Sequence, residues 1–280
     1  SDYGWPVEQC LEEVLTLMER CLQEGADLIF APEEAQYKGA AKVPRRELAE
    51  TYSAGYLARC RELARKYEAY VLPWDYELAE DGRIYNTTYV IDRKGRDIGK
   101  YRKVQMTRGE QSKGISGGDD YAVFDLDFGK VGILICMDNY YPESAAVLAH
   151  RGAELILYPL YGDTLTGRWE TRTRARAIDH TVYVAPCHIH SSPRETGASY
   201  TGLIDPEGEV VARLTEEGTY RVVEVEMGRQ VITQMSGVGQ GVFEDTKQYV
   251  RYIRNGAPFA PVADPVEKWP WEQVRWREST

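Results

Sequence analysis

The 280-residue chain has only four histidines and five cysteines, and no two cysteines are spaced as a CxxC pair. Structural zinc sites need clustered Cys and His ligands, so no metal centre is expected. The odd number of cysteines and their scattered positions also argue against a disulfide scaffold. We therefore expect reduced thiols, no bound metal and no disulfide framework.

The chain also lacks an excess of positive charge and a long apolar run. Its formal net charge is −10, whereas a nucleic-acid-binding domain is usually basic. No apolar segment approaches the roughly 20 residues that a membrane-spanning helix needs, and no polybasic patch suggests a membrane surface. Ser1–Pro6 has neither the basic nor the apolar part of a signal peptide. These observations predict a cytoplasmic protein that binds neither nucleic acid nor membrane.

What the chain does contain is an alternation of helical and strand patterns. Apolar residues recur at three- and four-residue spacing in the expected helices, and short β-branched or aromatic runs mark the expected strands. The expected helices are residues 8–24, 45–67, 144–151 and 167–180. The expected strands are residues 26–31, 69–73, 85–91, 97–104, 121–128, 130–136, 153–159, 181–186, 199–204, 209–214 and 220–225. This order favours an α/β fold, and the similar segments Gly25–Pro32 and Gly152–Pro159 suggest two matching halves.

One cysteine, Cys136, stands where a predicted strand breaks toward a predicted helix. The preceding run is apolar and β-branched, and the following segment contains Asn139 and Pro142 before the helical pattern begins. In open α/β sheets, ligands bind beyond the carboxyl ends of the strands. Cys136 is therefore a candidate nucleophile, although on position alone a buried, unreactive core thiol stays open as the alternative.

Carboxylates and a lysine stand near two other strand ends. Glu33 and Glu34 follow a strand pattern that ends at Pro32. Because side chains alternate across a strand, at most one of the two can point into a shared site; the alternative is that both are solvated. Lys103 follows a basic cluster, and the polar loop Thr107–Asp120 after it contains Glu110. That loop lacks the GxxxxGK[ST] order of a phosphate-binding loop.

Two further segments are weaker candidates. The tract Cys187-His188-Ile189-His190 could be a metal tract or a Cys–His dyad, but no second ligand cluster accompanies it, so we interpret it as pocket lining. The segment Gly197–Thr201 misses the nucleophile elbow, because that motif requires glycine where Thr201 stands.

Three motifs, taken in order, resemble those of the nitrilase superfamily of carbon–nitrogen hydrolases. They are Ala26–Glu33, Tyr101-Arg102-Lys103, and Gly132–Asp138 followed by Tyr141-Pro142-Glu143. Supporting similarities lie in Arg176–His180, Gly197–Ser199 and Asp205–Gly208. Each motif alone is weak, but together and in the family's order they identify the chain, from about residue 24 to residue 225, as a member.

The resemblance implies that Cys136 is the nucleophile and Glu33 the general base. Lys103 is then the third member, and Glu110 corresponds to a second glutamate near the lysine. In such a site the carboxylate takes the thiol proton and returns it to the leaving amine, and the sulfur forms an acyl intermediate that water resolves. The lysine and the backbone N–H of Met137 stabilise the thiolate and the tetrahedral oxyanion.

The resemblance further implies a four-layer α-β-β-α sandwich, with residues 1–255 as the carbon–nitrogen hydrolase domain. Residues 256–280 are then a C-terminal extension that packs on the domain or on a partner subunit. Family members pair through the helix after Cys136 and the helix after Pro159, so a homodimer or larger homo-oligomer is expected. The implied reaction is hydrolysis of a small linear amide through a Cys-bound acyl intermediate, without cofactor or metal. A nitrile substrate, acyl transfer to an amine and a non-catalytic scaffold are the alternatives.

Some positions are interpreted as structural or depart from the family pattern. Asp138 and Glu143 match motif positions but are expected to anchor a strand end and a helix entry. Asp179 and His180 stand where Glu and Asn are usual, which should alter contacts near the pocket or the dimer interface. The family usually opens with a strand before its first helix, and Ser1–Pro6 has no strand pattern, so the chain is either truncated there or builds that edge differently.

Overall fold

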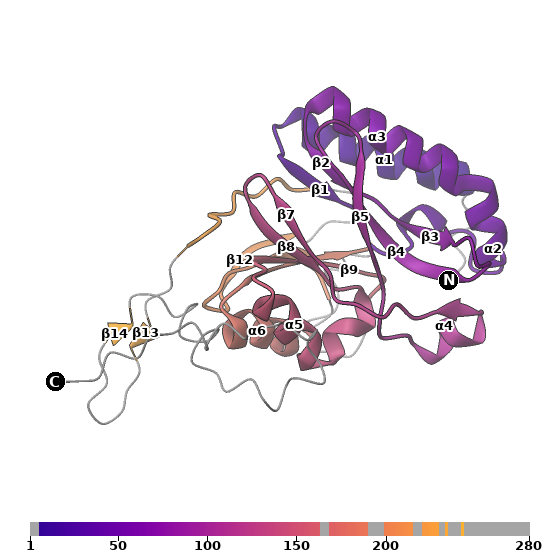
Figure 1. Cartoon of the computed structure of the whole chain (residues 1–280). Helices are drawn as coiled ribbons and strands as arrows, with labels where there is room; N and C mark the ends of the chain where they lie inside the picture. Colours follow the sequence, from indigo (N-terminus) through magenta and orange to yellow (C-terminus); the bar gives the residue numbers. More distant parts are fainter. Residues whose placement is uncertain are drawn as a thin grey trace.

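The computed structural model describes residues 6–162, 168–189, 199–214 and 220–229, with the short paired strands β13 (Thr233–Gln234) and β14 (Val242–Phe243). Figure 1 shows four layers: α1 (Val7–Gln23) and α3 (Ala54–Tyr67) cover one sheet, and α5 (Pro142–His150) and α6 (Arg168–His180) cover the other. The two sheets face each other between these helices. The predicted four-layer α-β-β-α sandwich is confirmed.

The first sheet is built around a central strand, β4 (Ile84–Ile91), which is antiparallel to three neighbours and parallel to a fourth. The other strands of this sheet are β1 (Leu28–Phe30), β2 (Tyr70–Leu72), β3 (Trp74–Leu78), β5 (Asp97–Arg102) and β6 (Ile115–Ser116). β1 pairs in parallel with β2. A turn at Asp81-Gly82 joins β3 to β4, with the Ala79 N–H donating to the Arg83 carbonyl over 2.9 Å.

The second sheet has the strand order β12-β11-β10-β9-β8-β7. Its strands are β7 (Val123–Leu126), β8 (Gly129–Ile133), β9 (Leu155–Leu160), β10 (Tyr183–His188), β11 (Thr201–Ile204) and β12 (Val210–Leu214). β8, β9 and β10 run parallel, and β9 is buried along its whole length. Because parallel strands end at the same edge, the segments after β8 and β9 lie close together.

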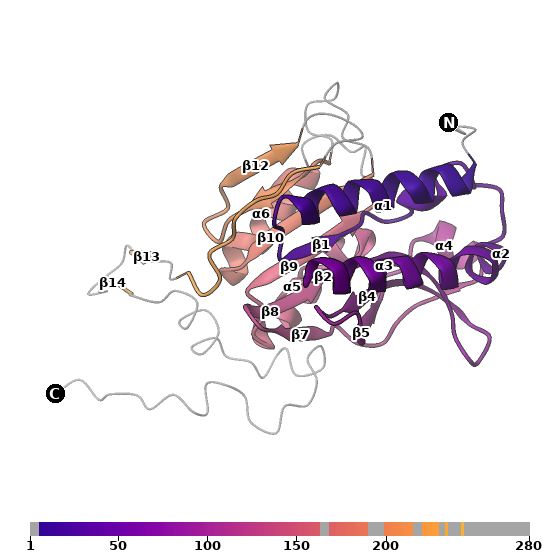
Figure 2. The ribbon, with the colours of Figure 1, turned by 90° about the horizontal axis from the view of Figure 1, so that it is seen from above.

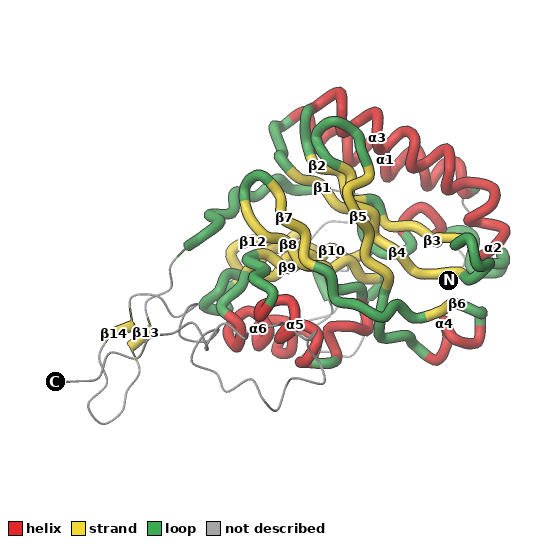
Figure 3. The backbone as a smooth tube through the Cα atoms, viewed as in Figure 1, coloured by secondary structure: helices red, strands yellow, loops and turns green. Residues whose placement is uncertain are grey.

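The predicted helix over residues 45–67 forms, but it is not uniform. It begins as α2 (Arg45–Leu48), passes through a π-helical stretch at Ala49–Ser53, and continues as α3. Single-turn elements η1 (Ala35–Tyr37), α4 (Arg108–Ser112) and η3 (Cys136–Tyr140) occupy segments expected as loops or turns. Figure 3 shows α4 as a short helix leading into β6.

The helices pack through apolar faces. On α1 the buried side chains include Leu11, Leu15, Met18 and Leu22, which share one face of the helix. Figure 2 shows α1 and α3 side by side over the first sheet. In the described part of the chain, no helix has both the length and the apolar character needed to cross a bilayer.

The strand predicted over residues 220–225 is wrong. Val223 and Val225 are half-buried between exposed neighbours, which is the alternation of a strand, but the segment has no strand pairing. Among the described residues β1 has only β2 as a neighbour. β1 and residues 220–225 both line an apolar cavity of about 670 Å³. This cavity separates the backbone of residues 220–225 from the other edge of β1. Residues 1–5, at which the family's first strand was considered, lie outside the described residues.

Candidate active site

Three of the predicted site residues lie just beyond the ends of strands. Glu33 follows β1 and Lys103 follows β5, both in the first sheet, whereas Cys136 follows β8 in the second. Glu33 is 4% exposed and Lys103 is 1% exposed. An ion pair buried to this extent must be fully hydrogen-bonded, because two desolvated charges are otherwise very costly.

Lys103 contacts both predicted glutamates. Its Nζ donates to Glu33 Oε1 over 2.9 Å and to Glu110 Oε1 and Oε2 over 2.8 and 3.0 Å. Burial by itself lowers the pKa of Lys103, but the negative charges of Glu33, Cys136 and Glu110 outweigh it and hold that pKa well above its usual value. The lysine is therefore a fixed positive charge inside the site.

Asn86, which the sequence analysis did not single out, completes this cluster. Its Nδ2 donates to Glu33 Oε1 over 2.7 Å and to Glu110 Oε1 over 2.8 Å. Its Oδ1 accepts from Trp74 Nε1 over 2.5 Å, which fixes the direction of the amide. Asparagine is disfavoured inside strands, so an asparagine in the middle of β4 was the sequence feature that could have indicated a site residue.

Glu110 also stabilises α4, the short helix to which it belongs. Its Oε2 accepts from the Thr107 N–H and hydroxyl, each over 2.8 Å, and its N–H donates to Thr107 Oγ1 over 3.1 Å. This is a capping box at the start of α4. Burial raises the pKa of Glu110, but the charge and hydrogen bond of Lys103 outweigh burial and lower it, so Glu110 is an anion at neutral pH.

Glu33 is tied to the second sheet as well. Its Oε2 accepts from the backbone N–H of Tyr161, the residue after β9, over 2.8 Å. Both oxygens of the carboxylate are therefore fixed, one by the first sheet and one by the second. Tyr161 contributes through its backbone, which is why no side-chain pattern in the sequence pointed to it.

Cys136 opens the turn η3 in a left-handed conformation, with φ +45°. A non-glycine residue there is strained, and such strain is common at functional sites. Burial raises the pKa of the Cys136 thiol, the charge and hydrogen bond of Glu33 add to this, and Lys103 opposes it. Met137 is the second residue of η3, where the amide has no partner within the helix, so its N–H is available to an oxyanion.

Asp138 fixes the distance between the two strands that carry Lys103 and Cys136. Its Oδ2 accepts from Tyr101 Oη over 2.7 Å and from the Ile135 N–H over 2.8 Å, and its Oδ1 accepts from the Gln105 N–H over 2.7 Å. Burial raises the pKa of Asp138 to about 6. The predicted anchoring role of Asp138 is confirmed. Glu143 lies exposed in the first turn of α5, where a carboxylate favours helix entry.

The expectation for Glu34 was partly right. Glu33 and Glu34 do point to different surroundings: Glu33 is buried, and the Glu34 side chain is 21% exposed. Glu34, at φ +59°, accepts a hydrogen bond from Tyr76 Oη and pairs with Arg45 over 3.5 Å. Burial raises the pKa of Glu34, and Arg45 opposes the shift. Glu34 therefore belongs to a polar cluster with Tyr76 and Arg45.

The competing segments lie elsewhere. Cys187 and His188 line the apolar cavity beside β1, as the pocket-lining interpretation expected, and His190 lies outside the described residues. Gly197 and Ala198 are also outside them, whereas Ser199 is buried. Across the described ranges, no group of three or more His, Cys, Asp and Glu side chains is arranged to hold a metal ion.

Comparison with known proteins agrees with this geometry. The sequence profile of the carbon–nitrogen hydrolase family matches residues 2–235. The chain is 31% identical over 234 residues to omega-amidase NIT2-A of Xenopus laevis, covering 78% of this chain and 83% of that protein. It is also similar to Saccharomyces cerevisiae Nit3, a member of the nitrilase superfamily, with a TM-score of 0.65, 27% identity and coverage of 77% and 83%.

A further solved structure shares the fold. It is a mutant of the amidase from Nesterenkonia sp. AN1, with acrylamide added at the active-site cysteine; the TM-score is 0.63, the identity 21%, and the coverage 75% of this chain and 84% of that one. The chain thus belongs to the carbon–nitrogen hydrolase family of the nitrilase superfamily. It is a thiol-dependent hydrolase of non-peptide carbon–nitrogen bonds.

Proposed function

We propose that the protein hydrolyses small linear amides and that Cys136 is the nucleophile, Glu33 the general base and Lys103 the electrostatic partner. Glu110 holds the lysine in place. The observation that supports this assignment is one buried ammonium group in contact with two carboxylates, beside a thiol whose pKa responds to the charges of Glu33 and Lys103. The two carboxylates already stabilise the buried lysine, so the stability of the fold does not by itself explain why a thiol lies beside it.

The raised pKa of the Cys136 thiol defines the first step. The thiol is protonated at rest, so Glu33 takes its proton as the sulfur attacks the amide carbon. The carbonyl oxygen becomes an oxyanion, which Lys103 and the Met137 N–H stabilise. As the C–N bond breaks, Glu33 returns the proton to the nitrogen, and ammonia leaves a thioester on Cys136.

The second step reverses these roles. Water attacks the thioester carbon while Glu33 takes a proton from the water. The C–S bond then breaks, the proton returns to the sulfur, and the carboxylic acid is released. No oxidant, reductant or cofactor enters this balance.

Amides that carry a carboxylate at the far end of the chain are the first substrates to test, since the omega-amidases are among the relatives. Nitriles are the alternative substrates, and transfer of the acyl group to an amine is the alternative second step.

Ammonia release from a panel of amides and matched nitriles tests the proposal. Cys136→Ala and Glu33→Gln should each lower kcat/KM by about 10³-fold or more. Cys187→Ala, a thiol outside the site, is the matched control and should retain activity. Undiminished release in Cys136→Ala would contradict the assignment, and faster turnover of a nitrile would favour the alternative substrate.

We also propose that residues 1–255 act as one hydrolase domain with residues 256–280 as an extension, and that the protein is a cytoplasmic homodimer. The five cysteines are all free thiols, which suits a reducing compartment. The dimer is proposed to form through α5 and α6. Cell fractionation tests the compartment.

A further inference from the structure

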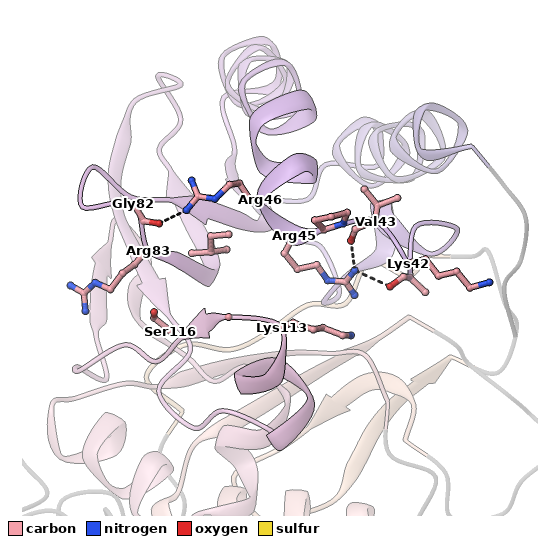
Figure 4. A pocket seen from close by; sticks show the side chains of 12 residues that line it. Lys42, Val43, Arg45, Arg46, Gly82, Arg83, Lys113 and Ser116 are labelled. Atoms are coloured by element: carbon pink, nitrogen blue, oxygen red, sulfur yellow. Dashed lines mark hydrogen bonds between the residues drawn. The ribbon is translucent and has the colours of Figure 1, made fainter.

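A second cavity, of about 530 Å³, is lined by positive charge (Figure 4). Three segments form it: Ala41–Arg46 at the start of α2, Gly82–Ile84 at the β3–β4 turn, and Lys113–Ser116 after α4. The lining includes five basic residues and no acidic one, and the basic residues are Lys42, Arg45, Arg46, Arg83 and Lys113. The protein as a whole has a net charge of −10, so this cavity differs in sign from the molecule that surrounds it.

The cations are held in a defined frame. Arg45 donates from Nη1 to the carbonyls of Ala40, Ala41 and Val43 and from Nε to Tyr76 Oη. Figure 4 shows Arg46 turned to the Gly82 carbonyl, to which its Nη2 donates over 2.6 Å. A guanidinium fixed by backbone carbonyls loses little freedom when a ligand binds, which favours recognition.

Lys113 differs from these arginines. Arg45 pairs with Glu34 over 3.5 Å, Arg46 with Glu50 over 3.6 Å and Arg83 with Asp81 over 2.6 Å. Within the described residues, the Lys113 side chain makes no ion pair or hydrogen bond, although its charge reaches Glu34. Five cations gather around this cavity and Lys113 has no ion pair of its own in the described part of the chain, so the local potential is positive and an anion would neutralise it.

The cavity adjoins the catalytic carboxylates. Lys113 follows Glu110 by three residues, which is about one helical turn. Ile84, which lines the cavity, and Asn86, which binds both carboxylates, point to the same face of β4; two residues along a strand span roughly 7 Å. An anion in the cavity therefore lies next to the catalytic cluster.

We propose that this cavity binds an anionic group, a carboxylate or a phosphate. Guanidinium and ammonium groups attract the oxygens of either through their positive charge, and the Lys113 ammonium can donate hydrogen bonds to them. The group could be the free end of the substrate itself or belong to a separate small anion. Anion binding as such does not depend on the amidase activity, whereas the substrate source does rest on that proposed function.

Calorimetric titration with sodium phosphate and with sodium glutarate, at constant ionic strength, tests the site. The wild type should bind both, and the Arg46→Gln/Lys113→Gln variant should bind them about tenfold more weakly. The matched control, Lys94→Gln/Lys130→Gln, removes the same charge from exposed positions outside the cavity and should bind as the wild type does. Equal binding by the cavity variant and the wild type, or no binding by the wild type at tens of millimolar, would overturn the proposal.

Kinetics separate the two sources. If the anion is the end of the substrate, the ratio of KM for a carboxylated amide to KM for a neutral amide rises about tenfold in the cavity variant. If it is a separate ligand, phosphate changes the rate on the neutral amide in the wild type and loses this effect in the variant. Absence of turnover on every amide would defeat the proposed function but leave the calorimetric result on the cavity standing.

Discussion

The charges around Cys136 depend on the balance of a few buried groups. Glu33 and Glu110 contribute two negative charges and Lys103 one positive charge, so a thiolate on Cys136 would add a further negative charge. This accounts for the raised pKa of the thiol and for the need for a base. Asn86 offsets part of the imbalance, because its amide donates to both carboxylates at once.

Replacing Asn86 by Leu should therefore impair both stability and catalysis. Each hydrogen bond to a charged group is worth about 1.5–3 kcal/mol, and the change removes two of them and leaves Trp74 Nε1 without its acceptor. We expect a fall in kcat of about 10²-fold and an acidic limb of the pH–rate profile displaced to higher pH, because the anionic carboxylates lose a donor.

Thr88→Val is the matched control for Asn86→Leu. Thr88 lies two residues along β4, is equally buried, and its hydroxyl has no hydrogen-bond partner in the described residues. Its replacement should leave the pH–rate profile unchanged. An Asn86→Leu variant with the wild-type pH–rate profile would show that the amide does not tune the carboxylates.

We expect the free energy of unfolding to depend on pH because of Asp75. Burial raises its pKa to about 7 from the ordinary value of 3.8, although Tyr37 Oη and the Tyr76 N–H donate to it. The folded state thus holds one more proton than the unfolded state between these values, so this contribution is largest below pH 4 and is lost as pH rises to 7. The loss is about 4 kcal/mol.

Urea unfolding between the two pKa values of Asp75 measures this effect. Asp75→Asn should flatten the fall in unfolding free energy over that range, whereas Asp125→Asn, at an exposed position on β7, should not. Parallel pH profiles for the wild type and Asp75→Asn would contradict the expected proton uptake.

At the residue level, the groups proposed to react could be predicted from the sequence, whereas the groups that orient them could not. Glu33, Lys103 and Cys136 stand in motifs, Glu110 stands in the polar loop that follows Lys103, and the structure brings Lys103 against both glutamates. Asn86 and the Tyr161 N–H reach Glu33 only because strands distant in sequence meet at one edge. Such contacts depend on tertiary pairing, which single-sequence patterns do not encode.

Among the elements, α4 has the greatest dependence on one side-chain pair. It is five residues long, too short to be stable from helix propensity alone, and the capping box between Thr107 and Glu110 holds it. The same Glu110 carboxylate binds Lys103. Helix capping and the position of Lys103 are therefore linked.

Thr107→Val should expose that link. Loss of the cap should cost about 1 kcal/mol of unfolding free energy and lower kcat several-fold, because Glu110 is less firmly placed against Lys103. Ser112→Ala, which changes an exposed hydroxyl of the same helix, is the control. Chemical denaturation and steady-state kinetics give the two readouts, and equal kcat values for both variants would separate the cap from catalysis.

Helices and strands were predictable where the apolar pattern was long and where the residues it marks are buried in the structure. Residues 8–24 and 45–67 form helices and residues 85–91 a strand, because burial and pattern agree there. β3 was missed, since Pro73 and a mixed polar sequence interrupt its pattern. Residues 220–225 were assigned wrongly, because alternation predicts which side chains are buried but does not provide a backbone partner.

At the scale of the molecule, the site exists only where the two sheets meet. Glu33, Asn86 and Lys103 come from the first sheet, and Cys136 and Tyr161 come from the second. Asp138 joins the two through Tyr101 and Ile135. Relative movement of the sheets would therefore separate Glu33 from Cys136, and any contact that stiffens the sandwich supports the site.

A dimer through the outer helices would provide such a contact. Ile178 on α6 is 51% exposed and Tyr141 at the start of α5 is 42% exposed, and Figure 1 shows both helices on the outer face of the second sheet. Apolar side chains exposed on one face mark an interaction surface when they gather together. We expect Ile178→Asp to weaken the dimer at least about tenfold, because a charge must then be buried at the interface.

Sedimentation velocity over a range of protein concentrations measures this change. Ile98→Asp is the matched control, since Ile98 is 43% exposed but lies on β5 of the other sheet. If α5 and α6 form the interface, only Ile178→Asp shifts the dissociation constant, and its kcat falls on dilution as dimers separate. A wild-type protein that sediments as a monomer at micromolar concentration, or equal shifts for both variants, would place the interface elsewhere or remove it.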